Sequence, residues 1–516
     1  MQYITNREEI QAIDRYTIEE IGIPSMVLME RAAMAVVQVL TDYAEELNLS
    51  ASHPVQALIV TEGGNNGGDG LAIARMLSEL HYEVTVWQIG GVKHETEQYA
   101  AQKHILQQMG IPVVYGHSEE MVNALRQPRY DMIIDAIFGV GLQREIVSPQ
   151  KEVIELLNQA GGLKCAVDIA SGVDSTTGEV LGTAFRADVT VTFGAMKLGH
   201  IFGEGADYSG DVLVADIGFP VQAFRKNPPC CYTYDREDLT RLPIRKKNGN
   251  KGTFGKVAVI AGSKDICGAA VLAATSAYRT GCGLVEVITH VNNRETIQKK
   301  LPEALLQVYE SEEQVAAYVR KAKEWADILV IGPGIGLTET AVCMLKEVLR
   351  GKKPLILDAD AITILSEHPE LIQSRTDHFE GSLDIVITPH MKEMERISRL
   401  PMEQLKKEPV QSAGIMAKQG YVCVLKDART VVAEPDSKDS YINLSGNDGM
   451  AAGGSGDILT GVIAGLYALG LPLNEAARLG VYLHGLAGDI AEEQCGHYSM
   501  IAGDILDGLV EVLREY

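Results

Sequence analysis

Hydrophobic residues follow two spacings along this chain, and the two spacings alternate. Near the start, Ile10, Ile13, Thr17 and Ile21 recur at helical intervals and predict an amphipathic helix. A second helix is expected over about residues 25–47. Beyond it, short apolar runs predict buried strands separated by helices. The strands predicted in this half of the chain cover residues 56–61, 83–89, 131–138, 164–170 and 187–193.

The alternation breaks off at about residues 222–252, where charges and prolines follow no clear period. It resumes with strands predicted at 256–263, 327–336, 354–362, 384–390 and 422–426, and the end of the chain is predicted to be helical over 457–469, 473–495 and 502–515. Strands that alternate with helices imply parallel sheets covered by helices on both faces. We therefore predict two α/β domains, at residues 1–222 and 235–516, of which the first is a Rossmann-like three-layer parallel sheet.

Composition narrows the class of protein. A chain of 516 residues is long enough for two or three domains, and 46% apolar residues is ordinary for a soluble globular protein. The net charge of −23 disfavours nucleic acids and anionic membranes as partners. The longest uncharged run, Ile458 to Leu473, is shorter than the roughly 20 residues of a membrane span. We expect a buried helix and its turn there.

The cysteines and the N-terminus predict a cytoplasmic protein. The eight cysteines form no CxxC pair, and most of them lie in apolar runs. Scattered cysteines of this kind are typical of reduced core residues in a reducing compartment. The first residues, MQYITNREEIQAIDRY, contain no apolar signal core.

The segment GGNNGGDG at residues 63–70 follows a predicted strand and precedes a helix. We predict a loop here, in which glycines 67, 68 and 70 let backbone N–H groups approach an anion. A phosphate or nucleotide site and a plain tight turn both explain the glycines. The amide side chains of Asn65 and Asn66 favour polar recognition or a cation over simple turn formation.

Polar residues also follow two neighbouring strands. Asp135 ends one strand, and Asp168 and Ser171 follow the next. Because ligands of open α/β sheets bind at such carboxyl ends, Asp135, Ser171 and Asn66 are expected to converge. Three oxygen ligands of this kind suit a hard metal ion better than zinc. The alternative is that the two aspartates only cap the helices that follow.

Taken together, these segments resemble the YjeF N-terminal domain, the NAD(P)H-hydrate epimerase family, over about residues 1–222. The resemblance rests on LMERAA, NNGGDG, DAIFGVGLQRE, DIASG and TVTFGAMKLGH, although Ala170 stands where the family usually has proline. It implies a potassium ion at Asn66, Asp135 and Ser171, a catalytic acid/base at Asp168 and a further candidate at Lys197. It also implies substrate contacts from two segments: Asn65, Asn66, Gly67, Gly68 and Asp69, and Gly139, Val140, Gly141, Leu142, Gln143, Arg144 and Glu145.

The substrate implied by this resemblance is NADH or NADPH with water added across C5–C6 of the nicotinamide ring. Reversible loss of the C6 hydroxyl needs a proton donor and acceptor, and one carboxylate can serve as both. Similar domains also occur as non-catalytic binding modules. Asp168 beside an intact NNGGDG segment favours catalysis.

The most specific signal in the chain is NDGMAAGGSGDILTG at residues 447–461. Glycines 453, 454 and 456 predict a nest of N–H groups at a helix start, which can stabilise a transferring phosphoryl group. Asp457 can take a proton from an attacking hydroxyl. A glycine-rich helix start with an acidic residue is the structural alternative.

This pattern resembles the ribokinase-like superfamily, and within it the NAD(P)H-hydrate dehydratase family over about residues 235–516. The additional segments are NKGTFGKVAVIAGS, IGPGIG, LDADAI, TPHMKEMERI and VLKDART, with Asn250 in place of a frequent histidine and Ser455 in place of a common threonine. The resemblance implies contacts to the hydrated cofactor from Ala270, Gly334, His390 and Asp457. It implies adenine-nucleotide contacts from Lys426, Asp427, Ala428, Arg429, Thr430 and Gly456.

Structural explanations exist for three of these residues. His390 also suits a strand-end hydrogen bonder, Lys426 a solvated strand end and Gly334 a turn.

The implied reaction uses the parts of a kinase for an elimination: Asp457 deprotonates the ring hydroxyl, which attacks the terminal phosphoryl group of ADP, and phosphate then leaves. Magnesium is implied on the nucleotide phosphates. The residues alone do not distinguish ADP from ATP as the phosphoryl donor, nor the hydrate of NADH (NADHX) from that of NADPH (NADPHX) as the substrate. The alternative function is a small-molecule kinase that uses ATP. The TPHMKEMERI segment and the adjoining epimerase domain favour dehydration. Both families often self-associate, so a homo-oligomer is expected.

Overall fold

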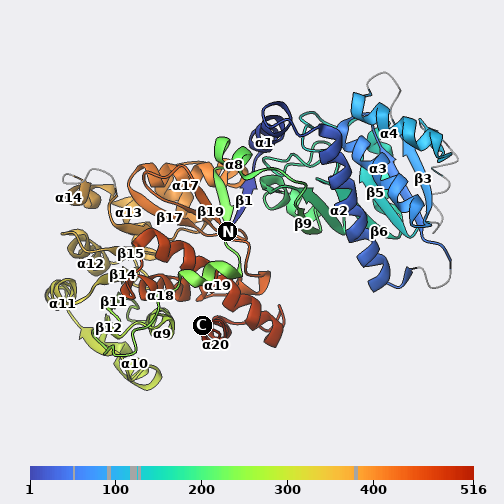
Figure 1. The fold of residues 1–516 in the computed structure, drawn as a ribbon. Helices are drawn as coiled ribbons and strands as arrows, with labels where there is room; N and C mark the ends of the chain where they lie inside the picture. The colour runs from blue at the N-terminus through green and yellow to red at the C-terminus, as the bar shows by residue number, and fades with distance from the viewer. Residues whose placement is uncertain (50–52, 90–94, 117–121, 123–124, 126–129, 377–381) are drawn as a thin grey trace. The chain divides into compact units, whose positions relative to one another are not determined.

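A computed structural model describes residues 1–49, 53–89, 95–116, 122, 125, 130–376 and 382–516 (Figure 1). The chain divides into two compact units. One unit is Gln2–Cys230, and the other is Cys231–Tyr516 together with Met1. The division falls at the proline- and charge-rich segment where the hydrophobic alternation breaks off.

The N-terminal unit is built on a seven-stranded sheet in the order β4-β3-β2-β5-β6-β7-β9, with every neighbouring pair parallel. The order in which strands are added reverses between β2 and β5. From β2 the chain first adds β3 and β4 on one side, and it then adds β5, β6, β7 and β9 on the other. The carboxyl ends of two such strands form the crevice where open α/β sheets bind ligands. The strands are β2 (Gln56–Thr61), β3 (Glu83–Gln88), β4 (Val113–Tyr115), β5 (Met132–Ala136), β6 (Leu163–Val167), β7 (Val189–Phe193) and β9 (Asp211–Ala215).

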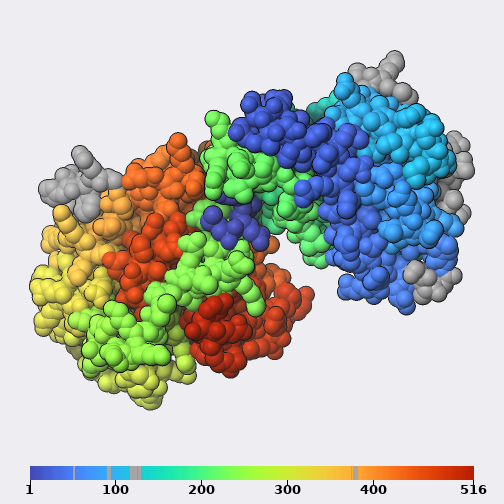
Figure 2. Space-filling view, in the orientation of Figure 1, coloured from blue at the N-terminus to red at the C-terminus, as the bar shows by residue number. Residues whose placement is uncertain are grey.

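Helices cover both faces of this sheet, which makes three layers (Figure 1). One apolar core lies between the sheet and α2 (Ser25–Glu46), α3 (Asn65–Glu79) and α4 (Glu97–Gln108). The other lies between the sheet and α6 (Gln150–Gln159). The outer side of α2 faces solvent (Figure 2). The remaining elements are α1 (Arg7–Glu19), α7 (Gly205–Tyr208), α8 (Val221–Lys226), and the short parallel pair β1 (Gln2–Thr5) and β8 (Met196–Lys197).

The C-terminal unit has its strands in the order β13-β12-β11-β14-β15-β16-β17-β18-β19-β10. The pairs from β13 to β17 are parallel, and β18 is antiparallel to both of its neighbours. The strands are β10 (Cys231–Thr233), β11 (Lys256–Ile260), β12 (Leu284–His290), β13 (Leu305–Tyr309), β14 (Ile328–Ile331), β15 (Leu355–Leu357), β16 (Ile385–Ile387), β17 (Tyr421–Leu425), β18 (Val431–Ala433) and β19 (Ser440–Ile442).

Four helices bury one face of this sheet in a single apolar core: α9 (Gly268–Thr280), α18 (Ser455–Ala468), α19 (Leu473–Cys495) and α20 (Ala502–Arg514). Glycines let α18 approach α9 closely, because a Cβ on Gly461 would lie 2.1 Å from the carbonyl oxygen of Ala273. The other helices of this unit are α10 (Arg294–Lys300), α11 (Glu312–Trp325), α12 (Glu339–Leu349), α13 (Asp360–Glu367), α14 (Gln373–Thr376), α15 (Met391–Ser398), α16 (Met402–Lys407) and α17 (Pro409–Lys418).

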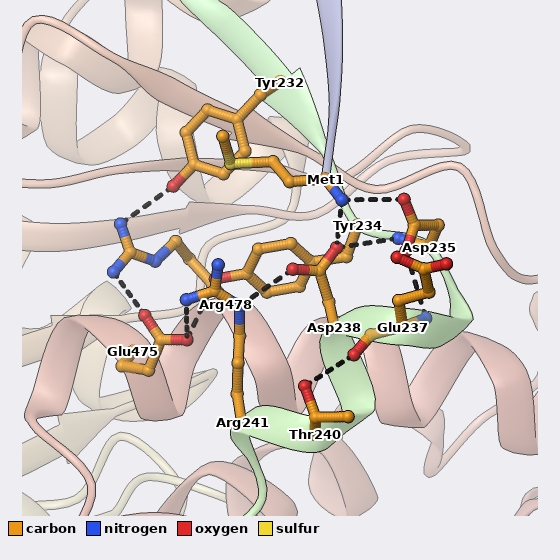
Figure 3. A network of polar contacts seen from close by, with 10 residues as sticks. All are labelled: Met1, Tyr232, Tyr234, Asp235, Glu237, Asp238, Thr240, Arg241, Glu475 and Arg478. Carbon is orange, nitrogen blue, oxygen red and sulfur yellow. Dashed lines mark hydrogen bonds and ion pairs between the residues drawn. The ribbon is translucent and has the colours of Figure 1, made fainter.

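A polar network fastens the start of this unit to α19 (Figure 3). The Tyr234 hydroxyl donates to Glu475 at 3.1 Å, and Arg478 donates to the same carboxylate at 2.6 Å. Arg478 also donates to the Tyr232 hydroxyl at 2.8 Å, and the side chain of Arg241 lies 3.5 Å from Glu475. The ring of Tyr234 packs on buried Tyr441. These contacts order the segment that follows the division between the units.

The predicted α/β class is confirmed in both units, and the bounds of several elements differ from the prediction. Ile21 lies beyond the end of α1 and is 41% exposed, so it does not belong to the buried face of that helix. The ten-residue strand predicted at 327–336 ends at Ile331, because Gly332, Gly334 and Gly336 all adopt positive φ. The uncharged run beginning at Ile458 forms the buried part of α18. Within the described ranges, no helix is both long and apolar enough to cross a bilayer.

Candidate active sites

A cavity of about 940 Å³ opens at the carboxyl ends of β2, β5 and β6. It brings together most of the residues predicted for the N-terminal site: Asn65, Asn66, Asp69, Gly139, Val140, Gly141, Leu142, Gln143, Arg144, Asp168 and Lys197. Gly67, Gly68 and Glu145 are not among its lining residues, and Asp135 and Ser171 are fully buried beside it. The site therefore lies where the reversal in strand order places it.

The NNGGDG segment was predicted to be a loop, and this prediction is wrong. The segment forms the first turns of α3, which begins at Asn65. Its glycines are needed because the helix packs tightly on its neighbours. A Cβ on Gly67 would lie 1.8 Å from the carbonyl oxygen of Glu62, and one on Gly70 would lie 2.6 Å from the Cβ of Ala136. The role of these glycines is close packing that holds the Asn65–Asp69 turn against the strand ends.

Asp135, at the end of β5, is joined to Ser171 by two hydrogen bonds. The Ser171 hydroxyl donates to Oδ1 at 2.6 Å and its backbone N–H donates to Oδ2 at 2.8 Å. Burial raises the pKa of Asp135 to about 6, against the effect of these bonds. Gly139 lies against the Asn66 side chain, whose buried Nδ2 has no partner among the described residues. A fully buried carboxylate with oxygen-bearing neighbours and, in the described parts of the chain, no basic partner is chemically suited to a hard cation.

Asp168 follows β6 in a strained backbone conformation, with φ of +68°. Its Oδ1 accepts from three donors: Lys197 Nζ at 2.5 Å, Thr192 Oγ1 at 3.1 Å and the Phe193 N–H at 3.2 Å. The His200 ring accepts from the Lys197 N–H at Nδ1, so its Nε2–H donates to the Asp168 carbonyl at 3.0 Å and holds the turn. Burial opposes ionisation of Asp168, but the Lys197 ammonium and the hydrogen bonds outweigh burial and lower its pKa. Lys197, a lesser candidate in the sequence, is thus a direct partner of Asp168.

Three further carboxyl groups, Asp14, Glu62 and Asp69, line the same cavity. Burial and the charges of Asp168 and Asp14 hold the pKa of Asp69 well above its usual range. Burial and the charge of Asp168 raise the pKa of Asp14 as well. Sequence reasoning missed Asp14, although it lies between Ile10 and Ile18 in the apolar stripe of α1. A lone acidic residue in a buried stripe was the available signal.

In the C-terminal unit, the predicted glycine-led helix start is present at α18. Gly454 precedes the helix with φ of +101°, and Asp457 lies in the first turn. Gly456 lies close to Lys426, because a Cβ there would lie 3.1 Å from Lys426 Nζ. The helix N-terminus, an ammonium group and a carboxyl group therefore meet at one place, which suits both phosphate binding and proton removal.

Lys426 is not a solvated strand end. Its Nζ donates at 2.7 Å to Oδ1 of Asp358, which is 2% exposed and also accepts from Thr388 Oγ1 at 2.6 Å. Burial and the charge of Asp358 raise the pKa of Asp457 to about 7, with Lys426 opposing the shift. A carboxyl group that titrates near neutral pH is poised to act as a general base. Sequence reasoning missed Asp358 although it lies in the LDADAI segment.

The other predicted contacts differ in how open they are. His390 caps α15, with Nδ1 accepting the Lys392 N–H at 3.1 Å, and its ring remains half exposed. Gly334 adopts a φ of +63°, and a Cβ there would meet Ile266. Ala270 is fully buried in the core, so its methyl group has no surface for a ligand. Asp427, Ala428, Arg429 and Thr430 form the partly open turn between β17 and β18.

Two family models match this chain, one within each compact unit. Residues 25–199 match the family model for the YjeF-related protein N-terminus, and residues 257–510 match the model for NAD(P)H-hydrate dehydratase. The bifunctional NAD(P)H-hydrate repair enzyme of Thermofilum pendens is 36% identical, over 98% of this chain and 95% of its own length. The corresponding enzyme of Moorella thermoacetica is also 36% identical, over 99% of this chain and 97% of its own.

The chain belongs to the family of bifunctional NAD(P)H-hydrate repair enzymes. It is also similar to a solved structure, the ADP/ATP-dependent NAD(P)H-hydrate dehydratase of Bacillus subtilis crystallised with ATP and Mg²⁺. The identity is 31%, over 55% of this chain and 98% of that one, with a TM-score of 0.48. The epimerase-type match to this family includes Asp69 and Asp168 but begins after α1, so Asp14 lies outside it.

Proposed function

We propose that the N-terminal unit interconverts the R and S forms of NADH and NADPH hydrates, and that the C-terminal unit dehydrates the S form with ADP, giving AMP and phosphate. The observation that carries the proposal is the place of the Asp457 carboxyl group, in the first turn of a glycine-led helix with Lys426 at the same helix start. Burial there, followed by the charge of Asp358, raises the pKa of Asp457 to about 7. Membership of the repair family supports the same assignment.

Dehydration begins when the Asp457 carboxylate takes the proton of the C6 hydroxyl. The hydroxyl oxygen attacks the terminal phosphorus of ADP and AMP departs, while Lys426 and the α18 N-terminus stabilise the charge of the transferring group. Phosphate then leaves C6 with the electrons of the C–O bond, and the ring nitrogen lone pair assists its departure. Loss of a proton from C5 restores the C5–C6 double bond.

Magnesium is proposed as the companion of the nucleotide phosphates, where it would neutralise their charge. Across the described part of the chain, no three Asp, Glu, His or Cys side chains are grouped so as to hold a metal ion. This arrangement fits an ion that is held mainly by phosphate oxygens and water, as Mg²⁺ usually is.

Potassium is proposed at Asn66, Asp135 and Ser171 in the N-terminal unit. The buried Asp135 carboxylate lacks a basic partner among the described residues, and the buried Nδ2 of Asn66, whose side chain lies against Gly139, makes no hydrogen bond to them. A monovalent ion there would neutralise Asp135 and orient the turns that carry Asn66 and Ser171 at the cavity edge. Asp168 is proposed as a carboxylate that acts on the nicotinamide ring from the same cavity.

Cysteines scattered in apolar runs, with no CxxC pair, support a reducing compartment, and we propose the cytoplasm. We also propose a homo-oligomer. Val27 and Met34, two turns apart on α2 with 47% and 60% exposure, are candidate contact residues for it.

The test supplies hydrated NADH to the full-length protein with ADP or ATP and Mg²⁺, and follows the return of dihydronicotinamide absorbance. The proposal expects repair only when nucleotide is present, with AMP and phosphate formed in step with NADH when ADP is the donor. A stable phosphorylated small molecule, or repair without nucleotide, would contradict it. A stable phosphorylated small molecule would instead indicate a kinase that uses ATP, joined to a binding module.

A further inference from the structure

The cavity of the N-terminal unit is lined by four carboxyl groups, and two of them, Asp168 and Asp69, lie in different environments. Asp168 is held by an ion pair and two hydrogen bonds on one oxygen. Donating a proton from this position would require Asp168 first to bind one against the charge of Lys197. The ion pair therefore keeps Asp168 as a carboxylate, which suits it to stabilise positive charge rather than to supply a proton.

Asp69 lies in the opposite situation. It is in the first turns of α3 and its side chain faces the cavity, and no residue in the described ranges makes a hydrogen bond or ion pair with its carboxyl group. The charged groups that share the cavity with it are Asp14, Glu62, Arg144, Asp168 and Lys197. Elsewhere around α3, basic groups are already engaged, since Arg75 pairs with Glu30 and Lys103 pairs with Glu95. Asp135 is bonded to Ser171.

Epimerisation at C6 requires that one C–O bond break and another form. Because the hydroxyl is a poor leaving group, it has to be protonated as it departs. The ring nitrogen then carries positive charge, which a nearby carboxylate stabilises. Two carboxyl groups kept in different protonation states meet both needs in one cavity.

We infer that Asp69 carries the proton exchanged with the C6 hydroxyl of the hydrate, while Asp168, ionised beside Lys197, stabilises the cation that forms. This inference rests on the proposed epimerase function. Asp69 gives its proton to the hydroxyl oxygen, the C6–O bond breaks with its electrons going to oxygen, and water leaves. The nitrogen lone pair forms a C6–N double bond. Water then adds to either face of the planar cation and returns a proton to Asp69, and addition to the opposite face gives the other epimer.

Asp14 is a positioning residue in this scheme, because its charge helps to keep the proton on Asp69. Burial and Asp168 act in the same direction. Activity that needs the acid form of Asp69 is lost as the pH rises through the pKa of Asp69. Removing the charge of Asp14 lowers that pKa, so the alkaline limb of the rate profile moves to lower pH.

The experiment measures R-to-S conversion by chromatography, without nucleotide, in the full-length protein and in Asp69→Asn, Asp14→Asn and Glu79→Gln. Glu79→Gln is the matched control, since it makes the same kind of change at an exposed position of α3. Nucleotide-dependent repair of the S form by each variant reports on the C-terminal unit. Thermal unfolding and equilibrium binding of the hydrate report that the N-terminal unit is folded.

The inference expects Asp69→Asn to lose a factor of about 100 to 10,000 in kcat while still binding the hydrate. It also expects Asp14→Asn to displace the alkaline limb to lower pH and Glu79→Gln to match the unmodified protein. Retention of kcat within a few-fold in Asp69→Asn, or an unmoved alkaline limb in Asp14→Asn, would overturn it. An unmodified protein that converts R to S no faster than the spontaneous reaction would instead overturn the epimerase function itself.

Discussion

Lys426 Nζ donates to Asp358 Oδ1 at 2.7 Å, in a position only 3.1 Å from where a side chain on Gly456 would begin. Asp358 thus fixes an ammonium group at the start of α18. Its charge also acts on Asp457 from the same place. One buried carboxylate therefore influences both the phosphate-binding group and the proposed base of the dehydratase.

Asp358→Asn tests this relationship. Burial is the main cause of the raised pKa of Asp457, and the charge of Asp358 is the next. Without that charge, and with Lys426 freed to face Asp457, we expect the acid limb of the dehydration rate to move to lower pH and the KM for nucleotide to rise. Rate profiles across pH measure the first and nucleotide titrations the second. Glu367→Gln, exposed on α13, is the control; a limb that stays in place would show that Asp358 does not act on Asp457.

The unmodified dehydratase has a pH dependence of its own. Asp457 serves as a base only when ionised, and its pKa is raised to about 7. The rate of nucleotide-dependent repair is therefore expected to fall as the pH drops below about 7, with kcat/KM halved near that value. Initial rates between pH 5.5 and 8.5 (roughly 1.5 units on either side of such a pKa) would test this. A rate that stays flat down to pH 5.5 would show that Asp457 is not the titrating base.

Asp457→Asn keeps the size of the side chain but removes the base. We expect it to reduce nucleotide-dependent repair by a factor of about 100 to 10,000 and to leave R-to-S conversion intact. Asp168→Asn is expected to do the reverse, so that the S form is repaired and the R form persists. A mixture of the two variants should repair both forms, since the hydrate diffuses between active sites. Loss of both activities in one folded variant would contradict two independent sites.

Asp135→Asn tests the proposed potassium site. The buried carboxylate supplies the negative charge of the site, so its loss is expected to abolish the stabilisation of the N-terminal unit by potassium. Melting curves in potassium chloride against choline chloride at equal ionic strength measure the effect. Asp42→Asn, at an exposed position of α2, is the control. Equal melting temperatures of the unmodified protein in the two salts would exclude the site.

Gly70→Ala tests the packing role of the NNGGDG segment. Its Cβ would lie 2.6 Å from the Cβ of Ala136 and 3.0 Å from the Cγ2 of Thr61. Overpacking of this kind costs about 1–3 kcal/mol, so we expect a lower free energy of unfolding for the N-terminal unit. Gly161→Ala, which has open space around its added methyl group, should change it by much less. Chemical denaturation compares the two, and equal stability would show that α3 can shift away from the sheet at little cost.

Several elements were predictable because local pattern and packing agree. Strand β2 and helix α19 have the predicted bounds, since each is an uninterrupted apolar or amphipathic segment between clear turn residues. The start of α3 was predicted to be a loop because the five glycines of residues 63–70 oppose a helix locally. Tertiary packing reverses that preference, as Gly67, Gly68 and Gly70 have no room for a side chain.

The two acidic residues that sequence reasoning missed depend on contacts between distant parts of the chain. The role of Asp358 becomes apparent only in the fold, where it follows β15 and lies beside Lys426, 68 residues later in the chain. Asp14 lies on a helix that no recognised segment covers, and only the cavity connects it with Asp69 and Asp168. The pairing of Asp168 with Lys197 is of the same kind, since the partners are 29 residues apart.

The close packing of α3 against its neighbours has a consequence for the evolution of such domains. If Gly67 and Gly70 of NNGGDG are retained by packing, a descendant that has lost its chemistry will keep them, because a side chain at either position would meet the Glu62 backbone or the strands of the sheet. The glycine pattern would then persist in the sequence after the activity is lost. The Asp69 carboxyl group makes no hydrogen bond or ion pair with a described residue, so no such interaction selects for it once catalysis is lost. A homologue that retains the glycines but replaces Asp69 is expected to be a pseudoenzyme, and this one position should distinguish working copies from inherited scaffolds.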